Sequence, residues 1–148
     1  LLKISSFGKG RDVILHHLKY ISREGRLSLE DETGAKINSL VECKRLIEEW
    51  SVDFSEKKRL RDTMHLLISP SSIQCAETLT QATRHFLASE FKANQYRYLF
   101  VTHLDTKQPH THVVIKMMTS SDKRITPDKD YMYGLKYQLA QICQSLFA

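Results

Sequence analysis

Residues 96–103, YRYLFVTH, and residues 110–118, HTHVVIKMM, decide the fold of this chain. Both stretches are rich in aromatic and β-branched residues, which favour β-strands. Only six residues, LDTKQP at 104–109, separate them, and this length suits the loop of a hairpin. We therefore predict that the two stretches pair as antiparallel strands at the centre of a β-sheet.

The rest of the chain predicts helices and further strands around this hairpin. Apolar residues recur with helical spacing in four ranges: 11–23, 39–50, 74–92 and 131–147. Strand-like patterns occupy three shorter ranges: 1–6, 26–30 and 63–69. Ser39 and Glu42 form the sequence signature of a capping box at the start of the second helix. The pattern predicts the α+β class, an antiparallel β-sheet with helices packed on it.

Composition limits the kinds of protein that this chain can be. Its 148 residues are 41% hydrophobic and 26% charged, as in one globular domain. Apolar runs are too short for a transmembrane helix, and the first residues do not resemble a signal peptide. The net charge of +5 permits nucleic-acid binding without establishing it. We expect the three widely spaced cysteines to be reduced, buried thiols rather than zinc ligands.

Three histidines stand at the ends of the predicted hairpin strands. His110 and His112 are two residues apart on one strand, so their side chains point to the same face. The hairpin brings His103, at the end of the preceding strand, alongside them. Three imidazoles with one open side are typical of a catalytic metal site. The alternatives are unrelated surface histidines, or a structural zinc site, which the lack of a nearby cysteine disfavours.

Tyr20 is the second feature that points to chemistry. On a helical wheel, Ile14, Leu18 and Ile21 form one apolar stripe, and Tyr20 lies roughly opposite to it. Tyr20 is therefore a poor candidate for the core of its own helix. It is either an exposed, half-packed tyrosine or a nucleophile that the helix presents to the metal site.

Three blocks, in order, resemble relaxases, the strand-transfer endonucleases of conjugative mobilisation. They are YISREGRLSL at 20–29, MHLLISP at 64–70 and YRYLFVTHLDTKQPHTHVVI at 96–115. The resemblance covers about residues 13–145 and is strongest to the MobP group, within it to the T-DNA border relaxases of type IV secretion systems. It implies the fold of the HUH endonuclease superfamily. One departure is Thr111, where the family has a bulky apolar residue between the two histidines.

The resemblance implies site- and strand-specific DNA nicking and rejoining at a transfer origin. Tyr20 would attack the scissile phosphate and stay attached to the 5′ end, while His103, His110 and His112 would hold a divalent metal. The family works with Mg²⁺ or Mn²⁺, and three imidazoles would also accept Zn²⁺ or Ni²⁺. Asp105 would either take the proton of the tyrosine or orient a metal-bound histidine.

Basic residues that border the two motifs are candidate contacts to the DNA backbone, with solvated surface charge as the alternative. They are Lys19, Arg23, Arg26, Lys116, Lys123 and Arg124. We expect His65 to be a core histidine. Tyr131 and Tyr133 are the less favoured candidates for a second nucleophile.

The resemblance also implies the setting in which the chain works. We expect residues 1–148 to be a single catalytic domain from the N-terminal part of a longer protein. Its partners would be single-stranded DNA at a transfer origin, an accessory DNA-processing protein and the type IV secretion coupling machinery, without membrane insertion. It would act in the bacterial cytoplasm and could be exported while covalently attached to DNA.

Three other functions remain open at this point. A rolling-circle replication initiator or transposase of the same superfamily shares the paired histidines but usually has its tyrosine after them. A catalytically inactive domain would only bind single-stranded DNA. A two-histidine phosphoesterase needs two H-x-[ST] motifs, which the sequences that follow His65 and His103 do not supply.

Overall fold

A computed structural model describes residues 1–104 and 107–146 of the chain. Within these residues six strands form one antiparallel sheet in the order β1-β4-β6-β5-β2-β3. The strands are β1 (Leu2–Gly8), β2 (Leu29–Asp31), β3 (Lys36–Ile37), β4 (Thr63–Ile68), β5 (Tyr98–His103) and β6 (His110–Lys116). The helices are α1 (Arg11–Ile21), α2 (Leu40–Trp50), α3 (Ala76–Glu90) and α4 (Lys129–Leu146). The predicted α+β class is confirmed.

The predicted hairpin lies at the centre of this sheet. β5 and β6 pair antiparallel, with His103 opposite His110 and Val101 opposite His112. The other edge of β6 pairs with β4, so β6 has a neighbour on each side. The ends of β5 and β6 that carry the histidines are therefore fixed by backbone hydrogen bonds within the sheet.

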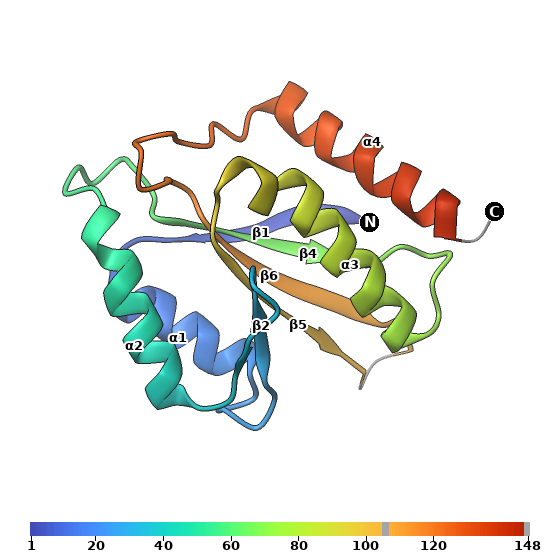
Figure 1. Cartoon of the computed structure of the whole chain (residues 1–148), viewed down its shortest axis with the longest axis horizontal. Helices are drawn as coiled ribbons and strands as arrows, with labels where there is room; N and C mark the ends of the chain where they lie inside the picture. Colours follow the sequence, from blue (N-terminus) through green and yellow to red (C-terminus); the bar gives the residue numbers. More distant parts are fainter. Residues whose placement is uncertain (105–106, 147–148) are drawn as a thin grey trace.

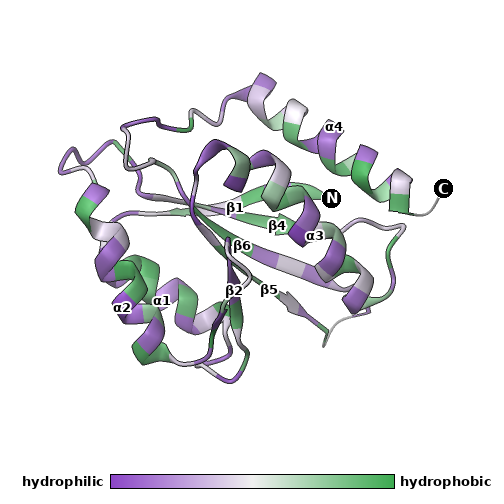
Figure 2. Cartoon of the chain, viewed as in Figure 1, coloured by the Kyte–Doolittle hydropathy of each residue, from purple (hydrophilic) through white to green (hydrophobic). Residues whose placement is uncertain are grey.

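Helices cover the two faces of the sheet in pairs (Figure 1). α1 and α2 enclose one core, in which Ile14, Leu18 and Ile47 pack against Leu99 and Val114. α3 and α4 enclose the second core on the opposite face. Figure 2 shows hydrophobic and hydrophilic residues mixed along each helix, as in helices that bury one side only. The residues of β5 and β6 that share a face with His103 and His112 belong to the first core.

The structure confirms the predicted start of α2 and corrects the predicted end of α1. α2 begins as predicted, because the Ser39 side chain accepts a hydrogen bond from the backbone N–H of Glu42 at 3.2 Å. α1 ends at Ile21 rather than at residue 23, since Arg23 and Glu24 have positive φ angles of 53° and 59°. A left-handed backbone cannot continue a right-handed helix. The chain therefore turns sharply just after Tyr20.

Two smaller expectations need correction. No strand is predicted for residues 31–37, but Lys36–Ile37 forms the short strand β3, which pairs with β2. Of the three thiols expected to be buried, Cys43 and Cys143 are buried but Cys75 is exposed. Cys75 is the residue directly before α3, and its side chain lies outside the second core.

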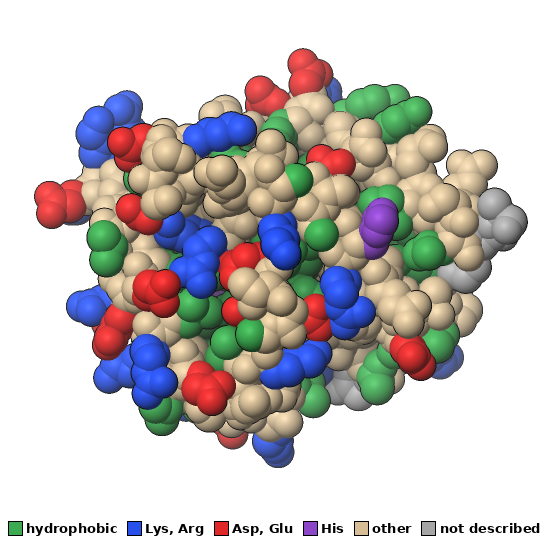
Figure 3. All heavy atoms as spheres, in the orientation of Figure 1, with side chains coloured by type: hydrophobic (Ala, Val, Ile, Leu, Met, Phe, Trp, Pro, Cys, Tyr) green, Lys and Arg blue, Asp and Glu red, His purple; other side chains and the backbone are tan. Residues whose placement is uncertain are grey.

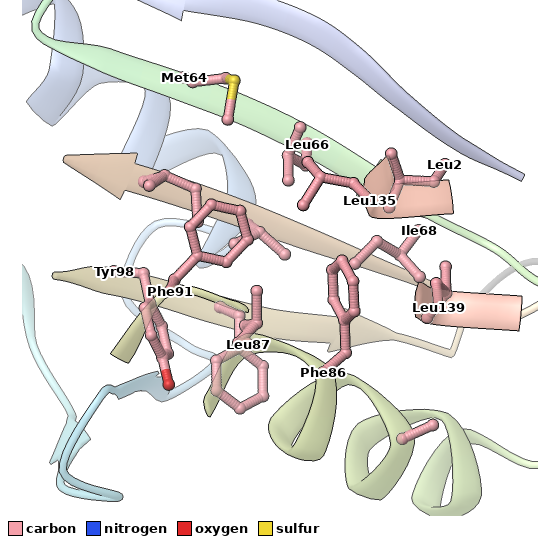
Figure 4. Packing of buried hydrophobic residues seen from close by; sticks show 14 of the residues in the cluster. Leu2, Met64, Leu66, Ile68, Phe86, Leu87, Phe91, Tyr98, Leu135 and Leu139 are labelled. Carbon is pink, nitrogen blue, oxygen red and sulfur yellow. The ribbon is translucent and has the colours of Figure 1, made fainter. Parts of the chain in front are cut away.

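Replacing Phe86 by alanine is expected to destabilise the protein by about 3–5 kcal/mol, because a large buried side chain leaves a cavity. Phe86 is completely buried on α3 and packs edge-on against Phe91 (Figure 4). Urea denaturation measures the change in the free energy of unfolding. Val52→Ala is the control, since Val52 is 83% exposed and its loss should change stability by less than about 0.5 kcal/mol. Equal stability of both variants would contradict this description of the core.

Candidate functional site

Three histidines meet at one end of the central hairpin, and we call them the histidine cluster: His103, His110 and His112. One ring nitrogen from each lies within 4.8 Å of those of the other two. The ring centroids of His103 and His112 are 4.5 Å apart, and those of His110 and His112 are 5.1 Å apart. The convergence predicted from the strand spacing is confirmed. It follows from the direct pairing of His103 with His110 across the hairpin.

His103 connects the histidine cluster to the end of α1. Its Nε2 lies 2.7 Å from the carbonyl oxygen of Ile21, the last residue of that helix. A carbonyl only accepts, so Nε2 carries the proton and donates it. The last carbonyls of a helix have no partner within the helix, and here a histidine side chain supplies one. This bond holds the C-terminal turn of α1 beside the cluster.

Tyr20 lies in that C-terminal turn, on the same side as the histidine cluster. Its side chain is 62% exposed, as the helical wheel predicted. Tyr20 and the histidine cluster line the same pocket of about 380 Å³, together with Leu1, Arg23, Leu67 and Ser69. The pocket is open to solvent on the side that the helix leaves uncovered. A substrate group bound there would touch both the phenol and the imidazoles.

The histidine cluster has the donor set of a transition-metal site. Burial is the main cause that lowers the pKa of His112 to about 4, and the neighbouring His103 and His110 lower it further. His112 is therefore neutral at pH 7 and offers a lone pair. Nδ1 of His110 lies 3.4 Å from the backbone oxygen of Gln108. Three imidazoles with an open side fit a catalytic divalent metal.

The cations near Tyr20 occupy the places that the sequence suggested. Lys19 is exposed beside Tyr20 on α1, and Arg26 is exposed in the turn that follows. Arg23 reaches into the pocket, where its guanidinium lies 3.3 Å from Nδ1 of His103. Arg23 lines the pocket, whereas Lys19 and Arg26 are exposed close to it in the chain.

The candidate cations at and after the end of β6 lie away from the pocket. Lys116 ends β6, six residues from His110, a separation of about 20 Å along a strand. Lys116 is 3% exposed and its ammonium group bonds to Asp53 at 2.6 Å. The expectation that Lys116 contacts DNA is wrong, because its charge is already buried in an ion pair. Lys123 and Arg124 follow at the same remote end of β6, and their DNA contact stays a prediction.

The face of the molecule that Figures 1 and 3 draw carries charged side chains of both signs. In Figure 3, which faces the same side as Figure 1, basic and acidic side chains are interspersed. A surface of mixed sign gives a polyanion no preferred path. The grouping of Lys19, Arg23 and Arg26 beside Tyr20 is thus the feature that favours a phosphate backbone.

Thr111, which separates the two paired histidines, points to the opposite face of the sheet. Its hydroxyl lies 3.0 Å from that of Thr102 and 3.3 Å from that of Thr83 on α3. The departure from the family pattern therefore leaves the histidine side of the strand unchanged. Asp105, the predicted base or orienting group, lies outside the described residues.

Tyr131, one of the alternative nucleophiles, packs on the far side of the sheet. It contacts the second core, between α4 and the sheet, and burial raises its pKa. Tyr133 is exposed on the same helix. Because the sheet separates α4 from the histidine cluster, neither hydroxyl shares the pocket of Tyr20.

His65 is a core histidine, as predicted, and it stacks on His17 of α1. The two rings are 3.9 Å apart and nearly parallel. Both nitrogens of His65 have hydroxyl partners, Ser6 at 2.8 Å and Thr63 at 2.7 Å. Burial, with a further contribution from His17, lowers the pKa of His65 to about 3. His65 therefore stays neutral in the folded protein and supports the helix that carries Tyr20.

Acid is expected to destabilise the fold through His65. The unfolded chain binds a proton at His65 below pH 6.5, whereas the folded protein does so only near pH 3. The contribution of neutral His65 to the free energy of unfolding is therefore complete above pH 6.5. It falls by about 1.4 kcal/mol per pH unit as the pH drops toward 3. Urea denaturation between pH 7 and 5 should show a shallower pH dependence for His65→Asn. His85→Asn, at an exposed position, is the control, and equal slopes for both variants would contradict the assignment.

Sequence reasoning missed several parts of the pocket. The carbonyl of Ile21, the side chain of Ser69 and the support that His17 gives through His65 are tertiary features. His17 had one available signal, since it lies three residues before Tyr20 on the same helix. Ser69 had none beyond its place at the end of a strand; its hydroxyl donates to the backbone of Pro109 at 3.0 Å.

Comparison with known proteins agrees with this geometry. The family model described as "Relaxase: MobA/VirD2-like, nuclease domain" matches residues 20–146, from Tyr20 to the end of α4. A search of curated proteins finds no match to the chain. Among the described residues no helix is long and apolar enough to cross a membrane.

Proposed function

The chain belongs to the family of MobA/VirD2-like relaxases, of the HUH superfamily, and we propose that it cuts DNA by transesterification at Tyr20. The nuclease domains of this family nick DNA in conjugative or mobilisation transfer. The observation that supports Tyr20 is its place in one pocket with the histidine cluster. The resemblance of the block at 20–29 to the family's tyrosine motif supports the same assignment.

The proposed reaction exchanges one phosphate ester for another. The Oη atom of Tyr20 attacks the scissile phosphorus, so an O–P bond to tyrosine forms while the bond from phosphorus to the 3′ oxygen breaks. The phenol loses its proton, and the departing 3′ oxygen gains one and leaves as a hydroxyl group. The 5′ phosphate stays on Tyr20. Because one ester replaces another, the reverse step can rejoin the strand without ATP.

We propose that His103, His110 and His112 hold the divalent metal that relaxases use. When bound, such a metal supplies positive charge to the phosphate oxygens on which negative charge develops. The neutral state of His112 and the hydrogen bond from His103 to Ile21 prepare the imidazoles for this role. We propose Mg²⁺ or Mn²⁺ as the functional metal, with Zn²⁺ or Ni²⁺ able to occupy the same nitrogens.

The proton of Tyr20 needs an acceptor, since a free phenol is a weak nucleophile at pH 7. We propose Asp105 for this role or, in preference, as the carboxylate that orients a histidine of the cluster. An Asp105→Asn protein that cleaves at the full rate would remove Asp105 from both roles.

The DNA strand would approach over the end of α1. The proposed contacts to its phosphates are Arg23, which lines the pocket, and the exposed Lys19 and Arg26. Because the sequence resembles T-DNA border relaxases, we also propose the setting in which the chain works. Residues 1–148 act as one catalytic domain in a bacterial cytoplasm, with an accessory protein and a type IV secretion system as partners.

Covalent capture of DNA tests the proposal. The protein is incubated with Mn²⁺ and a pool of end-labelled single-stranded DNA that includes candidate transfer origins, then separated on a denaturing gel. We expect labelled DNA to migrate with the protein, and the adduct to disappear when EDTA is present. DNA that binds without forming an adduct, from a pool that contains the cognate origin, would favour the binding-only domain.

A further inference from the structure

We propose that Arg23 competes with the metal for His103, and so couples metal binding to the arrival of the DNA phosphate. This inference rests on the proposed metal site and adds a regulatory role for a residue of the pocket. In the metal-free protein the guanidinium occupies the His103 nitrogen that the metal needs. A phosphate in the pocket then draws the guanidinium away and frees that nitrogen.

The hydrogen bonds of His103 identify the contested nitrogen. Nε2 donates to the carbonyl of Ile21 at 2.7 Å, which leaves Nδ1 as the nitrogen that can accept a bond or hold a metal. The guanidinium of Arg23 lies 3.3 Å from Nδ1 and, having no lone pair to offer, is the donor. One lone pair cannot serve a guanidinium and a metal at the same time. Metal binding through His103 therefore requires the Arg23 side chain to move.

The backbone holds Arg23 beside the histidine cluster. Arg23, Glu24 and Gly25 all have positive φ angles, a run that two non-glycine residues adopt only at an energetic cost. The turn is fixed by backbone bonds from Glu24 to the Lys19 carbonyl and from Leu27 to the Ser22 carbonyl, both 2.8 Å. Strain of this kind is often kept at functional sites. Here it reverses the chain immediately after Tyr20 and aims Arg23 at His103.

Charge makes the competition reciprocal. The guanidinium lies 3.3 Å from Nδ1 of His103, so its positive charge opposes a divalent cation at the cluster. A phosphodiester matches the planar guanidinium better than a single imidazole nitrogen does, because it can accept two parallel hydrogen bonds. DNA and metal both favour the position of Arg23 away from His103. Each should therefore raise the affinity for the other by the same factor.

Metal titration of the whole chain without DNA tests the competition. Isothermal titration with Mn²⁺ compares the original protein with Arg23→Met, which keeps bulk but loses charge and donors, and with Arg23→Gln. Both variants should bind Mn²⁺ about five- to tenfold more tightly, since a hydrogen bond and a repulsive charge are removed. Arg45→Met is the matched control, because Arg45 is an exposed cation on α2 outside the pocket. Unchanged Mn²⁺ affinity in both Arg23 variants would overturn the inference.

The coupling is measured by repeating the titration with the single-stranded DNA pool, in a Tyr20→Phe background that prevents cleavage. Mn²⁺ affinity should rise with DNA in both proteins, because the metal site also faces the phosphate, and it should rise severalfold more when Arg23 is present than in Arg23→Met. Equal responses of the two proteins, or no response in either, would overturn the coupling. Failure of the metal site itself has a different signature, in which Mn²⁺ binds no better to the original protein than to His112→Ala.

Discussion

His112→Ala is expected to weaken Mn²⁺ binding by more than about 100-fold, since losing a direct ligand costs more than losing a supporting residue, which costs 10- to 100-fold. The reason is geometric. The ring of His112 lies close to both other rings of the histidine cluster, 4.5 Å from that of His103 and 5.1 Å from that of His110. Because the pKa of His112 is low, protons compete little with Mn²⁺ for this residue at pH 7, so the full loss of Mn²⁺ affinity is measurable there. Isothermal titration with Mn²⁺ measures the affinity.

The control for His112→Ala is His85→Ala. His85 is an exposed histidine on α3, on the other side of the sheet from the cluster. We expect His85→Ala to bind Mn²⁺ like the original protein, and His112→Ala to lose adduct formation together with the metal. Unchanged Mn²⁺ affinity in His112→Ala would show that the ion binds elsewhere and would remove the basis for assigning the metal to this cluster.

Tyr20→Phe is expected to lower the rate of adduct formation by at least about 10³-fold, because the variant has no nucleophilic oxygen at this position. The lost hydroxyl belongs to a side chain that is 62% exposed, so folding should be unaffected. Mn²⁺ affinity should also stay within about twofold, since the variant leaves the imidazole ligands in place. Quantifying the adduct over time on a denaturing gel measures the rate.

Tyr137→Phe is the matched control for the nucleophile. Tyr137 is likewise exposed, but it lies on α4 across the sheet. Its replacement should leave the rate of adduct formation unchanged. A Tyr20→Phe protein that still forms the adduct at the original rate would move the nucleophile to another residue, with Tyr131 and Tyr133 the next to test.

Much of the site was predictable because it depends on local periodicity. Alternation along a strand places His110 and His112 on one face, and the short hairpin loop brings His103 beside them. The helical repeat of α1 likewise predicts that Tyr20 points away from its own core. These patterns involve only a few neighbouring residues. They therefore remain correct even where a predicted helix boundary is wrong, as at the end of α1.

What the sequence could not supply depends on contacts between distant segments. Lys116 looks like a free cation until Asp53, far away in the chain, is seen to bury its charge. The hydrogen bond from His103 to the end of α1 joins residues 82 positions apart. The left-handed turn at Arg23 opposes the ordinary preference of both arginine and glutamate. The last two features shape the pocket, and none of the three leaves a local pattern.

Mass spectrometry of the protein–DNA adduct tests the central claim most directly. After nuclease trimming and proteolysis, the modified peptide identifies both the residue and the end of the DNA to which it is joined. We predict a nucleotide linked through its 5′ phosphate to Tyr20, formed only when divalent metal is present. A nucleotide on any other residue, or one attached through a 3′ phosphate, would contradict the proposed transesterification.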